Sequence, residues 1–216
     1  MKYLVTLFSL IFSFGIFFAA DMVANIDLSC KEINVKENAF GNFAADALRK
    51  KAGSELAVVA AQSFNANSAI KKGKFTENDL KGMLSTPNSS VVVLKLSSAE
   101  VLDMFERSVS IVPQGSSAFL QVSGAVIIYN AQNNTGSRIV KATVNGAEVT
   151  RTSNKTYSVA MPLELGRGGN GYIRVFSSSS IAEMKVTDYT LLSSVTEYIK
   201  ELATLNFSTS SRIAAQ

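Results

Sequence analysis

The feature that most constrains the fold is the order of helix-like and strand-like segments. Two apolar runs of strand length, residues 55–61 and 90–96, are each flanked by helix-like segments. Beyond Pro113 the pattern changes, and short strand-like runs follow in quick succession. Among them, Asn145-Gly146 predicts a two-residue hairpin. This order predicts an α+β domain with a mixed β-sheet and helices packed on it.

Capping patterns and helical spacing locate the helices. Residues 42–51 predict a short amphipathic helix, and residues 76–84 begin with a helix-start pattern. Ser97 and Glu100 form a capping box that opens the next helix. An apolar stripe predicts a last helix over residues 190–205. Before it come a glycine-rich segment, LELGRGGNGY (residues 163–172), a strand-like run (172–176) and a polar loop (177–180).

Residues 1–20 are expected to lie outside the fold, because a lysine followed by a long apolar run is typical of a secretory signal peptide. Phe18 is bulky for a residue near a cleavage site, so an uncleaved N-terminal anchor is the alternative. Either reading predicts export to the periplasm or the extracellular space. Contact with a membrane is expected only if the segment stays uncleaved. Residues 21–216 are expected to form a single domain.

The chain contains no histidine. The usual general base near neutral pH and the usual nitrogen ligand of a metal centre are therefore missing. We expect no metal, no cofactor, and no Ser-His-Asp or Cys-His machinery. A Ser-Lys pair is left open by composition, but no Gly-x-Ser-x-Gly setting points to one.

The single cysteine, Cys30, cannot form a disulfide within the chain, and we expect it to be partly buried and without a chemical role. The net charge is +4, with the basic residues scattered in short clusters. Nucleic acid binding requires a concentrated basic face, so nucleic acid is not an expected partner.

Several segments occur in an order that resembles one known family. They are ENAFGNFAADALR (37–49), VVVLKLSSAEVLDMFERSV (91–109), FLQVSGAVIIYN (119–130) and GGNGY (168–172). The resemblance is to the C-terminal domain of 5'-nucleotidases and UDP-sugar hydrolases, and it covers roughly residues 37–213. It implies a domain that supplies a nucleoside pocket. In that family a separate calcineurin-like domain supplies two metals and cleaves the phosphate, and this chain has no histidine to build it.

The pocket departs from the family pattern. The family's N-G-G-G-I-R loop corresponds to AAQSFNANS (60–68), which puts Asn65 or Asn67 at the position of the phosphate-holding arginine. An asparagine cannot supply a bidentate cation. The two aromatic rings that clamp the base correspond to Thr86 and Glu164, and the aspartate of G-G-D-G-Y to Asn170. The resemblance thus implies a scaffold that is kept and a nucleotide site that is not.

The sequence therefore predicts a non-catalytic binding domain that takes a small ligand or a protein partner through the former nucleoside pocket. One alternative is a specificity subunit of a nucleotide hydrolase, acting with a separate metallophosphatase chain. Another is a structural or adhesive protein with glycans at its Asn-x-Ser/Thr sequences. Arg167 is either a new cation for an anionic group or an ordinary exposed arginine. The candidate ligand-binding residues are Gln62, Phe64, Asn65, Asn67, Thr86, Asn88, Glu164, Arg167, Gly168, Gly169 and Asn170.

Overall fold

The computed structural model describes residues 22–202, 205 and 207–216. The expected signal segment, residues 1–20, lies outside the described residues. Within them, no helix combines the length and the apolar character needed to cross a membrane.

A five-stranded sheet forms the centre of the molecule, with the strand order β12-β6-β11-β3-β7. Strands β11 and β3 are parallel, and the other neighbouring pairs are antiparallel. The predicted mixed sheet and α+β class are therefore confirmed. The strand bounds are Leu56–Ala60 (β3), Ser90–Ser97 (β6), Leu120–Ser123 (β7), Thr156–Pro162 (β11) and Lys185–Thr190 (β12).

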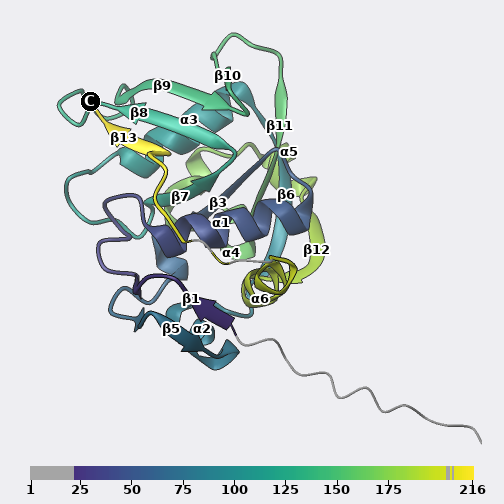
Figure 1. The fold of residues 1–216 in the computed structure, drawn as a ribbon. Helices are drawn as coiled ribbons and strands as arrows, with labels where there is room; N and C mark the ends of the chain where they lie inside the picture. The colour runs from purple at the N-terminus through teal and green to yellow at the C-terminus, as the bar shows by residue number, and fades with distance from the viewer. Residues whose placement is uncertain (1–21, 203–204, 206) are drawn as a thin grey trace, which may run out of the picture.

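Both faces of this sheet are covered, which explains its continuous apolar strands. Every residue of β3 is buried. Val59 joins a core cluster with residues of α1 (Ala39–Ala52) and α6 (Leu191–Glu201), whereas Val58 joins a second cluster with residues of α3 (Ser98–Val109). Figure 1 shows α1 crossing in front of the sheet with α6 beside it. Side chains that alternate between two apolar layers need no polar positions.

Helices α1, α2 and α3 form in the predicted segments, and a side chain caps the start of each. In α1, Asn38 accepts hydrogen bonds from the amides of Phe40 and Gly41, and Gly53 ends the helix with a left-handed φ of 59°. This helix begins three residues before the expected start at residue 42. Capping boxes open α2 (Glu77–Met83) and α3, as predicted.

A second sheet, ordered β10-β9-β8-β13, lies on the α3 side. The predicted hairpin at Asn145-Gly146 is confirmed, because both residues have positive φ and β9 pairs with β10. At the other edge, β13 runs parallel to β8. Arg212, just before β13, holds the Asp46 carboxylate on α1 with hydrogen bonds of 2.8 and 2.9 Å. The bounds are Ala125–Tyr129 (β8), Ile139–Val144 (β9), Ala147–Glu148 (β10) and Ile213–Ala215 (β13).

Two short strand pairs and α2 complete the N-terminal part of the chain. Strand β1 pairs with β5, and β2 pairs with β4. Figure 1 shows β1, β5 and α2 together at the end of the molecule farthest from β13. Their bounds are Met22–Ala24 (β1), Leu28–Ser29 (β2), Ala69–Ile70 (β4) and Gly73–Phe75 (β5), and a 3-10 turn, η1, spans Ala61–Ser63.

The prediction of a strand at residues 172–176 is wrong. Residues Leu163–Gly166 form a helical turn (α4), and Gly169–Arg174 form a 3-10 segment (η2) with positive φ at Asn170 and Gly171. The amide of Ile173 donates to the carbonyl of Gly168, so the chain folds back on itself instead of extending. The polar loop expected at 177–180 is also wrong, because Ser177 caps a short helix, α5 (Ser178–Ala182).

The last helix is shorter than predicted. Helix α6 ends at Glu201, and Leu202 is its extended C-cap, so Leu205 does not continue the helical stripe. The edge strands β12 and β13 were not predicted at all.

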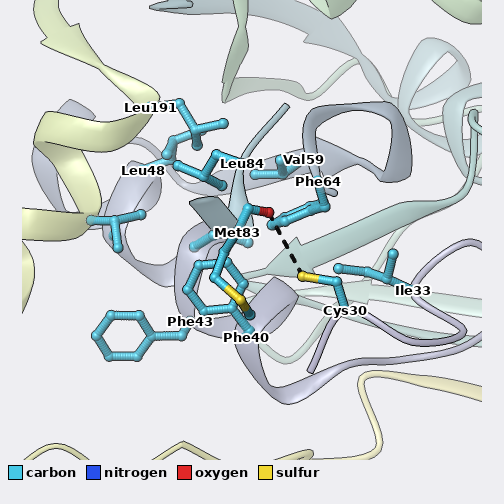
Figure 2. Packing of buried hydrophobic residues seen from close by; sticks show 14 of the residues in the cluster. Cys30, Ile33, Phe40, Phe43, Leu48, Val59, Phe64, Met83, Leu84 and Leu191 are labelled. Carbon is cyan, nitrogen blue, oxygen red and sulfur yellow. Dashed lines mark hydrogen bonds between the residues drawn. The ribbon is translucent and has the colours of Figure 1, made fainter. Parts of the chain in front are cut away.

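Cys30 is fully buried, deeper than expected (Figure 2). Its thiol donates to the carbonyl of Met83 at 3.8 Å, and burial raises its pKa to about 11. The thiol therefore behaves as a core group.

Candidate functional site

The loops that contain the predicted site residues meet at one edge of the central sheet. Strands β3 and β11 are parallel, so the segments that follow them lie at the same edge. Strands β6 and β7 are antiparallel to these, so the segments that precede them lie there too. We call this the loop edge; it comprises residues 62–68, 85–89, 115–118 and 163–171. The sheet topology thus unites the three segments that the sequence singled out and adds a fourth, residues 115–118.

Backbone hydrogen bonds tie the first loop to its neighbours. The amide of Ser85 donates to the carbonyl of Ser63 at 2.9 Å, and the amide of Asn65 donates to the carbonyl of Met83, also at 2.9 Å. The amide of Gln62 donates to the carbonyl of Ser117 at 3.1 Å. The first loop is therefore fixed on both sides, and its side chains project from a defined backbone.

A serine links the two positions where the family resemblance implies aromatic rings. The Ser89 hydroxyl donates to the Glu164 carboxylate and accepts from the amide of Leu163 at 3.2 Å. The Ser89 amide in turn donates to the carbonyl of Thr86 at 3.1 Å. The Thr86 hydroxyl oxygen is buried and has no hydrogen-bond partner among the described residues. A polar connection therefore stands where two rings would hold a base.

Asn170 is held by its own network. Its carbonyl accepts two hydrogen bonds from the Arg107 guanidinium, and its side-chain oxygen and nitrogen bond the hydroxyl and carbonyl of Ser117 at 3.1 and 3.2 Å. Its left-handed φ of 56° is uncommon for a residue with a side chain. These contacts hold the residue in that conformation, and they occupy both polar atoms of its side chain.

The glycines of this segment serve the turn itself. Gly168 has a φ of +88°, and a Cβ there would lie 2.6 Å from the backbone of Ile173. Gly171 has a φ of +84° and leaves room for Arg107, whose guanidinium would be 3.1 Å from an added Cβ. Both positions need a residue without a side chain to close the turn. The backbone geometry thus explains Gly168 and Gly171 without a ligand approaching the backbone.

The predicted residues differ in how far they are available at the surface. Phe64 is only 4% exposed and packs edge-on against Phe40, with ring centroids 5.9 Å apart (Figure 2). Its ring points into the core rather than to the surface. Gly168 is buried too, whereas Gln62, Thr86, Gly169 and Asn170 are half-buried and Asn65, Asn67, Asn88, Glu164 and Arg167 are exposed.

Three residues important to this edge were absent from the sequence prediction: Ser89, Arg107 and Ser117. Ser89 directly follows the predicted Asn88 in the sequence, so extending that predicted segment by one residue would have included it. Arg107 lies at the end of α3 and reaches Asn170 only through the fold. No sequence signal connects those two residues.

The loop edge is polar and has few charged groups. It presents the carboxylate of Glu164, the guanidinium of Arg167 and several carboxamides. Beneath it, the Tyr172 hydroxyl donates to the carbonyl of Ala118 at 2.7 Å, and burial raises the pKa of this phenol. In the described part of the chain, no three His, Cys, Asp or Glu side chains lie close enough together to hold a metal.

Comparison with known proteins agrees with this architecture. Residues 17–178 match the family described as 5'-nucleotidase, C-terminal domain. The chain belongs to this family. The 5'-nucleotidase C-terminal domain resemblance of the sequence is thereby confirmed.

Relatives of this 5'-nucleotidase C-terminal domain are much longer than the part they share with it. The chain is 29% identical to the trifunctional nucleotide phosphoesterase protein YfkN of Bacillus subtilis over 82% of its own length and 12% of that protein's. It is 32% identical to the snake venom 5'-nucleotidase of Naja atra over 51% of its length and 21% of the venom protein's. The match is therefore to a minor part of each relative.

Solved structures give the same result. A 5'-nucleotidase precursor from Thermus thermophilus superposes with a TM-score of 0.77 at 24% identity, covering 90% of this chain and 39% of that one. The NAD nucleotidase of Haemophilus influenzae gives a TM-score of 0.70 at 20% identity, covering 91% and 37%. At these identities the likeness establishes the fold.

Proposed function

We propose that this chain is an exported, non-catalytic member of the family that binds a small, hydroxyl-rich ligand at the loop edge. The observation behind this is the link from Ser89 to Glu164, which puts a carboxylate and a hydroxyl network where a base would need two rings. Stacking on aromatic side chains is worth about 1–3 kcal/mol per base, and this edge offers none of it at those positions. Carboxamides both donate and accept hydrogen bonds, as a ligand rich in hydroxyl groups requires.

A further feature supports a ligand here. The exposed Asn65, Asn67 and Asn88 come from two loops that backbone hydrogen bonds hold together. A fixed backbone reduces the entropy lost on binding.

The non-catalytic part of the proposal rests on residue types. The 216 residues contain no histidine, and Asn65 or Asn67 stands where the family holds phosphate with arginine. Neither asparagine can supply the bidentate cation with which an arginine holds a phosphate.

A thermal-shift screen of the purified full chain tests the proposal. The panel comprises nucleosides, nucleotides, nucleotide sugars and free sugars and polyols. A ligand at 100 times its dissociation constant adds about 2.7 kcal/mol of apparent stability, which is readily measured. We expect sugars or polyols to stabilise the chain, and Glu164→Gln to reduce the shift while Glu148→Gln, on the exposed hairpin strand β10, leaves it unchanged. Stabilisation by nucleosides alone would contradict the proposal.

A second candidate function follows from the coverage of the relatives. Because they extend far beyond the matched part, the chain could act as the specificity subunit of a separate metallophosphatase chain. Co-purification from the native host tests this candidate. A stable complex with a metal-dependent phosphatase, whose preference among phosphate esters changes on adding this chain, would favour it over the proposal above.

A further inference from the structure

A cavity of about 630 Å³ lies at the C-terminal end of α3, away from the polar side chains of the loop edge. Its walls come from α3, from the loop between β8 and β9, and from η2. We call it the α3 cavity. Its size falls within the range of about 300–1,000 Å³ that is typical of small-molecule sites.

One part of the lining is apolar and unusually accessible. Ile173 is 58% exposed and Ile111 is 43% exposed, and both line the cavity together with Val175. Large aliphatic side chains that gather around a hollow, instead of being scattered over the surface, indicate a binding surface. Gly136, on the β8–β9 loop, also lines the cavity, and a Cβ added there would meet no atom within 4 Å.

Two arginines form another part of the lining. The side chain of Arg174 is exposed and makes no hydrogen bond or ion pair with any residue that the structure describes. Arg107 donates to the carbonyl of Asn170 and to the Ser110 hydroxyl, which leaves some of its five N–H groups unused. A guanidinium with unused N–H groups beside an apolar wall fits a carboxylate with a hydrocarbon body.

One carboxylate, that of Glu106, also lines the cavity and adds a negative charge to it. Glu106 accepts hydrogen bonds from the amides of Arg138 and Ile139, at 3.0 and 2.8 Å, through different oxygens. Its charge is thus directed to the backbone at the start of β9. Two guanidinium groups against this one carboxylate leave the lining with a net positive charge.

We propose that the α3 cavity binds a small organic anion, a monocarboxylate with an apolar body of about five to seven carbons. The carboxylate pairs with Arg174 and the free N–H groups of Arg107. The hydrocarbon body covers Ile111, Ile173 and Val175. The two regions share Gly171 and the contact of Arg107 with Asn170, but this ligand uses none of the loop edge's exposed polar side chains, so the proposal does not rest on the function proposed there.

Calorimetric titration of the purified full chain with hexanoate, butyrate and 1-hexanol tests the proposal. We expect hexanoate to bind more tightly than butyrate, and the uncharged alcohol to bind much more weakly than either. In Arg174→Gln, hexanoate affinity should fall about tenfold. The matched control Lys95→Gln removes one charge from an exposed position on β6, and its affinity should stay within about twofold of the wild type.

Two further measurements separate this site from non-specific binding. Ile173→Ser, a change at an exposed position, should remove the preference for hexanoate over butyrate. Amide NMR shifts on adding hexanoate should be largest at Gly136 and Gly171, which line the cavity. Equal losses in the arginine and lysine variants, or shifts confined to other regions, would overturn the proposal, as would the absence of any response to hexanoate.

Discussion

Arg107, on helix α3, donates two hydrogen bonds to the backbone carbonyl of Asn170, with N–O distances of 3.0 and 2.6 Å. The two residues are far apart in sequence, and this contact joins a helix end to the glycine segment. It also places Arg107 between the loop edge and the α3 cavity. The conformation of Asn170 on the loop edge therefore depends on Arg107 of helix α3.

Replacing Arg107 should accordingly destabilise the fold. We expect Arg107→Ala to lower the free energy of unfolding by about 1.5–3 kcal/mol, because the lost bonds have a charged donor. Urea denaturation measures this change. Arg151→Ala is the control, since its ion pair with Asp103 is exposed and should contribute less than about 1 kcal/mol. Equal losses in the two variants would contradict the structural importance given to Arg107.

Gly168 should not tolerate a side chain. Its φ of +88° and the backbone of Ile173, 2.6 Å from an added Cβ, predict that Gly168→Ala lowers stability. A cost of about 1–3 kcal/mol is expected for such strain. Gly82 is the matched control, because it lies in helix α2 with no atom within 4 Å of an added Cβ. There alanine should raise stability by up to about 1 kcal/mol. Thermal melts of both variants measure the opposite signs.

Glu100 should make stability depend on pH. Burial opposes ionisation of this carboxyl, but hydrogen bonds from Ser177, Ser97 and Ser180 outweigh it, and its pKa lies below the ordinary value of 4.5. A lowered pKa in the folded state means that the ionised form stabilises the fold. The contribution is complete above the unfolded-state pKa and is lost as the pH falls through the folded-state value.

We therefore expect Glu100→Gln to lower stability at pH 7 by about 1–2 kcal/mol. The NH2 group of the glutamine would stand where a carboxylate oxygen now accepts hydrogen bonds, and it would face donors instead of acceptors. Both carboxylate oxygens now accept two bonds each. The difference from the wild type should shrink as the pH falls below the ordinary value of 4.5. Chemical denaturation from pH 7 to pH 3 measures this. A difference that persists unchanged at the lowest pH would show that the charge is not involved.

Cys30 should be chemically silent in the folded protein. It is fully buried, and its pKa of about 11 leaves on the order of one thiolate per thousand at pH 8. We expect no reaction with a thiol-specific chromogenic reagent in native buffer and stoichiometric reaction in denaturant. Rapid native labelling would mean that the segment around Cys30 opens locally.

Aromatic rings at two loop-edge positions should restore base stacking. We expect the double variant Thr86→Phe and Glu164→Phe to bind adenosine at least about tenfold more tightly than the wild type, as one base–ring contact alone would allow. Calorimetry measures the gain. The control places leucine at both positions, which adds apolar area without rings. Equal adenosine binding by the leucine variant would show that simple hydrophobicity, not stacking, is responsible.

Apolar runs and capping residues predicted the central strands and the first three helices, because their patterns are local. The strand prediction for residues 172–176 was wrong because it overlooked a helical spacing of the buried residues. Tyr172 and Phe176 are buried four positions apart, with Ile173 and Arg174 exposed between them, and this spacing belongs to a helix. Strand β12 lies at a sheet edge with polar residues on both faces, so no alternation revealed it.

The loop edge was accessible to sequence reasoning only through the family resemblance. That reasoning located Gln62, Thr86 and Glu164 on separate loops, and the topology of the sheet brings their loops together. The α3 cavity had no such guide. Arg174 reads as an ordinary surface arginine until the fold surrounds it with Ile111 and Ile173.

Strand β13 determines when the second sheet can close during synthesis. It covers the free edge of β8, and Arg212 beside it locks onto Asp46, far back in the chain. A ribosome releases these residues after the other three strands of the second sheet, so that sheet stays open until then. A shortened product ending before Ile213 would expose a bare strand edge, which invites pairing between copies. A nonsense mutation just before the codon of Ile213 would therefore promote aggregation and not only shorten the chain.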